Sequence, residues 1–169
     1  NPANAATVMK GLQEPYAKRS VEGDIGMRYS AQGILEAAGD RKLSKISGIN
    51  RQKIAGLVEY LGNHTDYIPD NEEMENMDYA LACAAVETAV TRHAGSLEQV
   101  YTPCGLTYLQ SGKDLRRVQY VIVTGGALIH AKHTEEIAKY ALYDESTPGS
   151  LRPEHAEILV DRKYILAAM

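Results

Sequence analysis

The segment YVIVTGGA, residues Tyr120–Ala127, predicts a buried strand that ends in a sharp turn. Its first four residues form a continuous apolar run, typical of strands that are buried on both faces of a parallel sheet. The run leads into Gly125 and Gly126, which lack Cβ atoms and therefore let the backbone turn sharply and approach a flat ring or a sugar. Ligands of open α/β sheets bind at the carboxyl ends of strands, where this turn is expected to lie. A Gly-Gly turn alone is more often structural than ligand-binding, so its function has to be inferred from the surrounding sequence.

The residues after this turn predict an α/β unit. Residues 134–142 have a helical pattern, and residues 156–160 form a second short apolar strand. Asp161 follows this strand directly and is well placed to cap a further, alanine-rich helix. The order strand, helix, strand, helix predicts an α/β core over residues 111–169.

The front of the chain is predicted to be mainly helical. Residues 1–23 show little periodicity and are expected to be irregular or to form short extended pieces. Residues 28–38 have a helical pattern, with Gly39 as the stop. In residues 50–61 the apolar positions recur at i, i+3, i+4 and i+7, the stripe of an amphipathic helix. These positions are Ile54, Leu57, Val58 and Leu61.

The longest predicted helix opens at Pro69-Asp70 and runs to His93, with Gly95 as its stop. Three glutamates in its first turn complement the helix dipole. In its middle, residues 80–85, mostly small side chains surround the helix axis. Neighbouring backbones can therefore come close, and the helix is expected to be central.

Two β-like segments follow this helix, residues 99–102 and 106–109, separated by Pro-Cys-Gly. This pattern predicts a hairpin or a broken strand pair. Residues 1–110 are therefore predicted to form a mainly helical subdomain with a short β-hairpin.

Composition excludes several classes of partner. The chain of 169 residues has a net charge of -4 and no basic stripe, which argues against binding to nucleic acid or an anionic membrane. Its apolar runs are too short to span a membrane, and no signal peptide opens it. Two cysteines, Cys83 and Cys104, indicate a reducing compartment, so a cytoplasmic location is expected.

The sequence contains no recognisable catalytic constellation. It has no serine nucleophile elbow, no Walker loop and no pair of carboxylates at the spacing of a known catalytic motif. The five histidines and two cysteines do not fall at zinc spacings. We therefore predict no catalytic residue and no metal site in this chain. Because it opens with Asn1-Pro2 and stops inside an apolar run, it is expected to be a C-terminal fragment of a longer protein.

The strand, the Gly-Gly turn and the Asp161 helix together resemble the superfamily of actin, heat-shock chaperones and sugar kinases. The resemblance implies one C-terminal lobe of an actin-like (ribonuclease H-like) ATPase fold, with the helical front half as an inserted subdomain. In that superfamily the Gly-Gly turn touches the adenosine of ATP. By this match Thr124, Gly125, Gly126 and Ala127 would contact nucleotide, and Asp161 would lie near the base.

Longer motifs resemble a narrower family, the accessory proteins of B12-dependent glutamate mutase called MutL or GlmL, which are unrelated to the DNA mismatch-repair protein of similar name. The motifs cover most of the chain and include residues 14–28, 112–116, 124–128, 151–153 and 161–168. The resemblance implies an ATP-binding, chaperone-like reactivating factor that helps exchange damaged for intact adenosylcobalamin on the mutase. ATP or ADP with Mg²⁺ would be its cofactor, with none bound tightly to this chain alone.

The sequence departs from the superfamily pattern at the turns that bind the phosphates of ATP. The Asp-x-Gly phosphate turns of the superfamily have no match here, and Asp24-Ile25-Gly26 lacks both the buried strand before it and the small donors after it. Asp24 is instead expected to cap a helix. In the chaperones a glycine at the corresponding turn approaches the nucleotide, so Gly23 is kept as a further nucleotide-binding candidate. Without phosphate turns the isolated chain is expected to be catalytically inert.

Two other functions remain open at this point. The parent protein could be a metabolic kinase of the same superfamily, which would need a catalytic Asp and substrate loops that these residues do not show. Alternatively, Gly125 and Gly126 could be purely structural, and the helical front half could dock a partner without any nucleotide.

Overall fold

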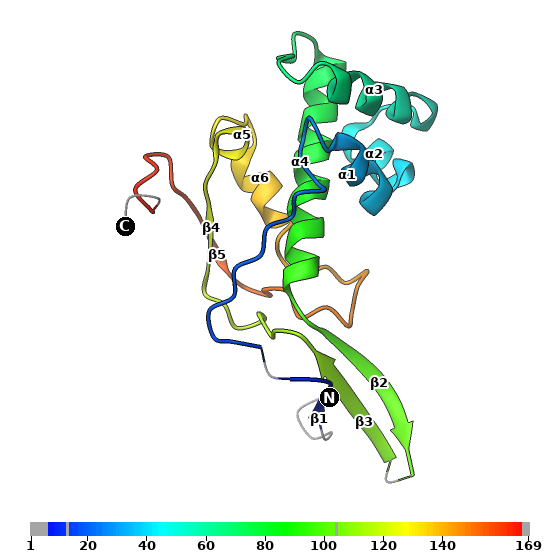
Figure 1. Ribbon diagram of the computed structural model, residues 1–169, viewed down its shortest axis with the longest axis vertical. Coiled ribbons are helices and arrows are strands. Elements are labelled where there is room, and N and C mark those ends of the chain that lie inside the picture. Colours follow the sequence, from blue (N-terminus) through cyan, green and yellow to red (C-terminus); the bar gives the residue numbers. More distant parts are fainter. Residues whose placement is uncertain (1–6, 13, 104, 167–169) are drawn as a thin grey trace.

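The computed structural model describes residues 7–12, 14–103 and 105–166, and shows a mixed α/β chain with two small sheets (Figure 1). The helices are α1 (Ala31–Ala38), α2 (Asp40–Ser47), α3 (Arg51–Asn63), α4 (Glu72–His93), α5 (Gly126–Ile129) and α6 (Thr134–Lys139). The strands are β1 (Thr7–Met9), β2 (Ser96–Thr102), β3 (Gly105–Ser111), β4 (Tyr120–Val123) and β5 (Glu157–Val160). No helix within these described ranges is both long and apolar enough to cross a membrane.

Helix α4 is the central element, as its small middle predicted. Helices α1 and α2 pack against its upper part and α3 packs against these two helices, while α6 packs against the other side of α4 (Figure 1). Its buried residues include Met77 and Leu81, both fully buried, and every residue from Ala80 to Ala84. The start of α4 is set by Asn71, whose side-chain oxygen accepts a hydrogen bond from the amide of Met74 at 3.0 Å.

Gly95 does not stop α4 in the predicted way. The helix ends at His93, and Ala94 is already extended, so the chain continues directly into β2. Gly95 is needed for a different reason. A Cβ atom at this position would lie 2.2 Å from the carbonyl oxygen of Ser111, so only glycine lets the base of β3 come this close.

Helix α2 was not predicted. Gly39, with φ of 81°, ends α1 and also begins α2, so the two helices follow one another without a connecting loop. Leu43 is fully buried against the core that surrounds α4, and Gly48 ends the helix in the left-handed conformation. The element is stabilised by packing on α4, which local sequence patterns do not reveal.

The predicted hairpin is confirmed and is longer than expected. Strands β2 and β3 are antiparallel over their full lengths, and β1 joins β3 in parallel. The hairpin extends away from the helical part of the molecule (Figure 1).

The predicted parallel α/β unit is also present. Strands β4 and β5 pair in parallel, with Tyr120 opposite Glu157 and Val123 opposite Val160, and α5 and α6 form the crossover. The expectation that β4 is buried on both faces was wrong. Tyr120 and Ile122 are about half exposed, because the described residues give this sheet only two strands and cover only one of its faces.

The division into residues 1–110 and 111–169 stays a prediction. Helix α4 contributes to a core shared with α1–α3, and it also packs against α6 through Ala82, Cys83 and Ile137. The helical half and the α/β half therefore meet along α4.

Candidate functional site

The glycine turn, Thr124–Ala127, lies at the carboxyl end of β4, where the sequence predicted it. Gly125 has φ of 98°, a conformation that favours glycine, and it is the N-cap of α5. Its carbonyl oxygen accepts hydrogen bonds from the amides of Leu128 at 3.1 Å and Ile129 at 3.0 Å. Gly125 is thus required by the backbone path itself, whether or not a ligand binds.

The backbone of the glycine turn is open. Thr124, Gly126 and Ala127 are exposed, and a Cβ atom built on Gly125 would meet no atom within 4 Å. At Gly126 the nearest atom is the Tyr164 hydroxyl, 3.6 Å from such a Cβ. In the described part of the chain, therefore, no side chain fills the space in front of Gly125.

Asp161 lies beside this turn because β4 and β5 are parallel and in register. Its amide donates to the carbonyl oxygen of Val123 at 2.9 Å. Its carboxylate accepts from the amides of Ile165 at 3.1 Å and Leu166 at 3.0 Å. The carboxylate is therefore engaged by the protein backbone.

The helix expected directly after Asp161 was wrong over residues 162–165. Residues 162 and 163 form a turn, and Tyr164 adopts φ of 52°. The carboxylate of Asp161 caps this turn instead of a helix. The remainder of the predicted helix, residues 167–169, lies outside the described residues.

Gly23 lies in the segment before α1, and its carbonyl oxygen accepts a hydrogen bond from the hydroxyl of Ser30 at 2.9 Å. The helix cap predicted at Asp24 was wrong, since α1 begins only at Ala31. The Asp24 carboxylate is bound by the Arg92 guanidinium of α4 at 2.8 and 2.9 Å, and this hydrogen bonding holds the pKa of Asp24 below its usual value. Asp24 therefore forms a long-range ion pair with Arg92 and does not cap a helix.

A hollow of about 270 Å³ lies between the segment around Gly23 and α5. The segment around Gly23 contributes Glu22, Ile25 and Met27, and α5 contributes Leu128. The floor is a strip of α4 made of Ala82, Ala85, Val86 and Ala89. The glycine turn and Gly23 do not line this hollow themselves, but residues next to each of them do. We call it the central hollow.

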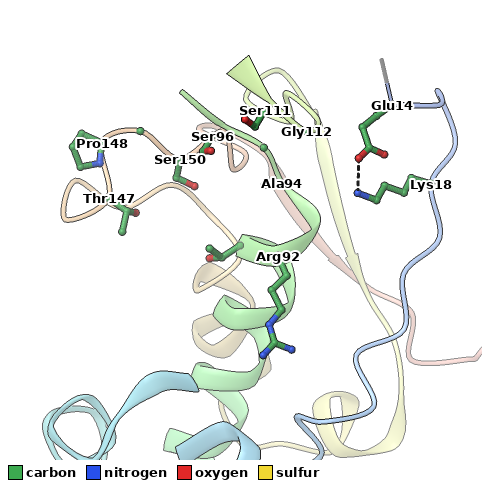
Figure 2. A pocket seen from close by; sticks show the side chains of 13 residues that line it. Glu14, Lys18, Arg92, Ala94, Ser96, Ser111, Gly112, Thr147, Pro148 and Ser150 are labelled. Carbon is green, nitrogen blue, oxygen red and sulfur yellow. Dashed lines mark hydrogen bonds and ion pairs between the residues drawn. The ribbon is translucent and has the colours of Figure 1, made fainter. Parts of the chain in front are cut away.

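A larger pocket of about 570 Å³ lies at the end of α4, and sequence reasoning missed it (Figure 2). Figure 2 shows Glu14 and Lys18, whose side chains are 3.1 Å apart, on one side, and the loop from Thr147 to Ser150 on the other. The base of the hairpin, with Ser96 and Ser111, closes it. The loop marker Pro148-Gly149 signalled one of its walls, but no local pattern showed that the walls meet, because they come from segments distant along the chain.

Cys83 is a buried, unpaired thiol, as expected for a small apolar residue in the middle of α4. Burial raises its pKa to about 11, so it stays protonated at neutral pH. The stability it contributes is complete below the usual thiol pKa and is lost as the pH rises towards this raised value. Cys104 lies outside the described residues.

The fold and the glycine turn define the class: a mixed α/β chain in which a parallel strand pair presents an open Gly-Gly turn beside a carboxylate. No solved structure matches this chain. The family model described as MutL protein matches residues 1–169. The chain is 44% identical over 168 residues to Protein MutL of Clostridium tetanomorphum, a match that covers 99% of this chain and 36% of that relative.

The chain therefore belongs to the MutL protein family, as its motifs predicted. It spans about a third of the length of the curated relative that it matches.

Proposed function

We propose that this chain forms the adenosine-facing lobe of an actin-like ATP-binding protein, and that the whole protein reactivates B12-dependent glutamate mutase. The observation that carries the proposal is the meeting of Thr124–Ala127 with Asp161 at the carboxyl ends of β4 and β5. Such ends of parallel strands are where open α/β sheets bind their ligands. Membership of the MutL family supports the same function.

The residues of the turn fit the adenosine half of a nucleotide. An adenine ring needs a flat wall without side chains, and the open backbone at Gly125 and Gly126 offers one. The exposed hydroxyl of Thr124 is available to a ribose, and the Asp161 carboxylate holds the neighbouring turn in place. The triphosphate and Mg²⁺ would be held by residues outside these 169, since the sequence has no phosphate turn.

Residues around the central hollow could transmit a conformational change from the glycine turn to the segment around Gly23. Leu128 follows the glycine turn directly and lines the hollow, so a change in α5 would reach the segment around Gly23 across α4. Arg92 ties that segment to α4 through Glu22 and Asp24. A chaperone-like factor requires such a link between nucleotide and partner surfaces.

ADP added to the full-length protein is expected to slow amide hydrogen exchange over residues 124–128. Replacing Gly126 by valine should weaken ADP binding about tenfold or more, a loss of about 1.4 kcal/mol, because the branched side chain occupies the wall against which the ring lies. Titration calorimetry measures this affinity. The control is Gly56→Val, a helical glycine of α3 with open space around it. Equal ADP affinity in both variants, or no protection of residues 124–128 in the parent protein, would refute the nucleotide site.

The mutase half of the proposal has its own test. Glutamate mutase loaded with an inactive cobalamin is expected to regain activity when the full-length protein, ATP and fresh adenosylcobalamin are added together. The Gly126→Val variant should restore activity more slowly at limiting ATP. Recovery that is the same without ATP would contradict an energy-driven factor, and a complete lack of recovery would contradict the partner.

A further inference from the structure

Arg152 is a buried cation with incomplete pairing. Its side chain is 1% exposed and lies in the loop that leads to β5. One terminal nitrogen donates to the carbonyl oxygen of Tyr140 at 3.3 Å, and the other to the hydroxyl of Thr147 at 3.2 Å. Both partners are neutral and both bonds are long. Within the described residues the Nε–H has no acceptor at all, although a buried guanidinium normally has its donors satisfied.

The nearest carboxylate does not complete the pairing. Oε1 of Glu87 is 3.8 Å from the Arg152 guanidinium, beyond hydrogen-bond distance. The same oxygen is 2.5 Å from the ammonium group of Lys42. Glu87 is therefore shared: it lies at hydrogen-bond distance from Lys42 and forms only a longer ion pair with Arg152, which leaves donors of the Arg152 guanidinium without a carboxylate hydrogen bond.

Arg152 lines a pocket of about 540 Å³ in which positive charge predominates. We call it the arginine pocket. Its lining has four cationic side chains, Lys42, Lys45, Lys139 and Arg152, against the two carboxylates of Glu87 and Asp144. Asp144 is held within its own turn by the amide of Ser146 at 2.7 Å. Three tyrosines, Tyr79, Tyr140 and Tyr143, supply flat walls.

The arginine pocket is separate from the glycine turn. It lies where α6 ends and before β5 begins, whereas the glycine turn follows the last residue of β4. The two sites are thus at opposite ends of the β4–β5 pair. The walls come from α2 and α4 of the helical half and from residues 139–152 of the α/β half, so an occupant would contact both.

We propose that the arginine pocket is a second ligand site, which binds a small organic anion through a carboxylate or phosphate group. An oxyanion is the acceptor that a guanidinium with free donors binds best, in a two-point contact. Lys45 and Lys139, exposed at the rim, add attraction, and the tyrosine rings pack against the organic part of the ligand. A net positive lining in a chain whose overall charge is -4 supports this selection for anions.

The test uses the full-length protein with inorganic phosphate and succinate as separate probes, at fixed ionic strength. Each anion that binds is expected to slow hydrogen exchange in peptides covering residues 40–47 and 140–152. The double variant Lys45→Gln with Lys139→Gln should raise the anion concentration needed for half-maximal protection about tenfold, because two charge-assisted contacts are lost. Both lysines lie outside the core, so this variant is expected to fold. Protection by only one probe supports the site and identifies the oxyanion it takes.

The matched control is Lys53→Gln on α3, which removes an exposed lysine that pairs with Glu73 at 2.6 Å outside the pocket. It should leave the half-maximal concentration unchanged. Arg152→Lys keeps the charge but removes the planar fork, and is expected to abolish protection at concentrations that saturate the parent. Unaltered exchange with both anions, or equal protection in the parent and the double variant, would overturn the proposal.

Discussion

Replacing Leu81 by alanine is expected to lower the free energy of unfolding by about 2–5 kcal/mol, the range for large-to-small changes in a core. Leu81 is fully buried in the cluster that joins α4 to α1 and α3, together with Ile34 and Ile54. The surrounding helices cannot close the space, because α4 is held by packing along most of its length. Urea denaturation followed by far-ultraviolet circular dichroism measures the change.

Ile68→Ala is the matched control for this prediction. Ile68 is 81% exposed, so its truncation removes apolar atoms that water already contacts and should change stability by less than about 0.5 kcal/mol. Similar losses in Leu81→Ala and Ile68→Ala would show that α4 is not the centre of the core.

A methyl group added at Gly33 is expected to destabilise the fold by about 1–3 kcal/mol, the usual cost of overpacking. Gly33 lies inside α1, and a Cβ atom there would be 1.8 Å from the carbonyl oxygen of Asp24. Because the obstacle is backbone, α1 or the segment around Asp24 must move. The Asp24–Arg92 pair should then weaken, and hydrogen exchange over residues 22–27 should become faster.

Gly56→Ala separates crowding from helix propensity. Gly56 also lies inside a helix, α3, but a Cβ atom there would meet nothing within 4 Å. The alanine is expected to raise stability by about 0.5–1 kcal/mol through reduced backbone entropy in the unfolded chain. A gain of stability in Gly33→Ala as well would mean that the segment before α1 does not pack as the structure shows.

The elements that sequence patterns identified are those with strong local signals. The apolar stripe from Ile54 to Leu61 predicted α3, and the small residues in the middle of α4 predicted a central helix. The Pro-Cys-Gly sequence between two β-like segments predicted the hairpin. Helix α2 was missed because it is eight residues long and follows α1 through Gly39 without a loop. Short helices depend on packing more than on their own propensity.

The candidate site was predictable only in part. The glycine turn and its place after a strand could be read locally, and the parallel register then brought Asp161 beside it. The ion pair of Asp24 with Arg92 joins residues 68 positions apart, so the local pattern wrongly indicated a helix cap. The burial of Arg152 had no local signal either, because arginine is usually exposed.

The family, the long helix α4 and the strand that turns at Gly125 could all be predicted from the order of the amino acids alone. These features depend on periodicity over neighbouring residues and on a positive φ that glycine adopts at little cost. The exposed face of β4, the pairing of Asp24 with Arg92, and the burial of Arg152 near five other charged side chains became evident only in the folded chain. Burial and charge pairing depend on residues distant along the chain, and they are fixed only when the helices and strands pack together.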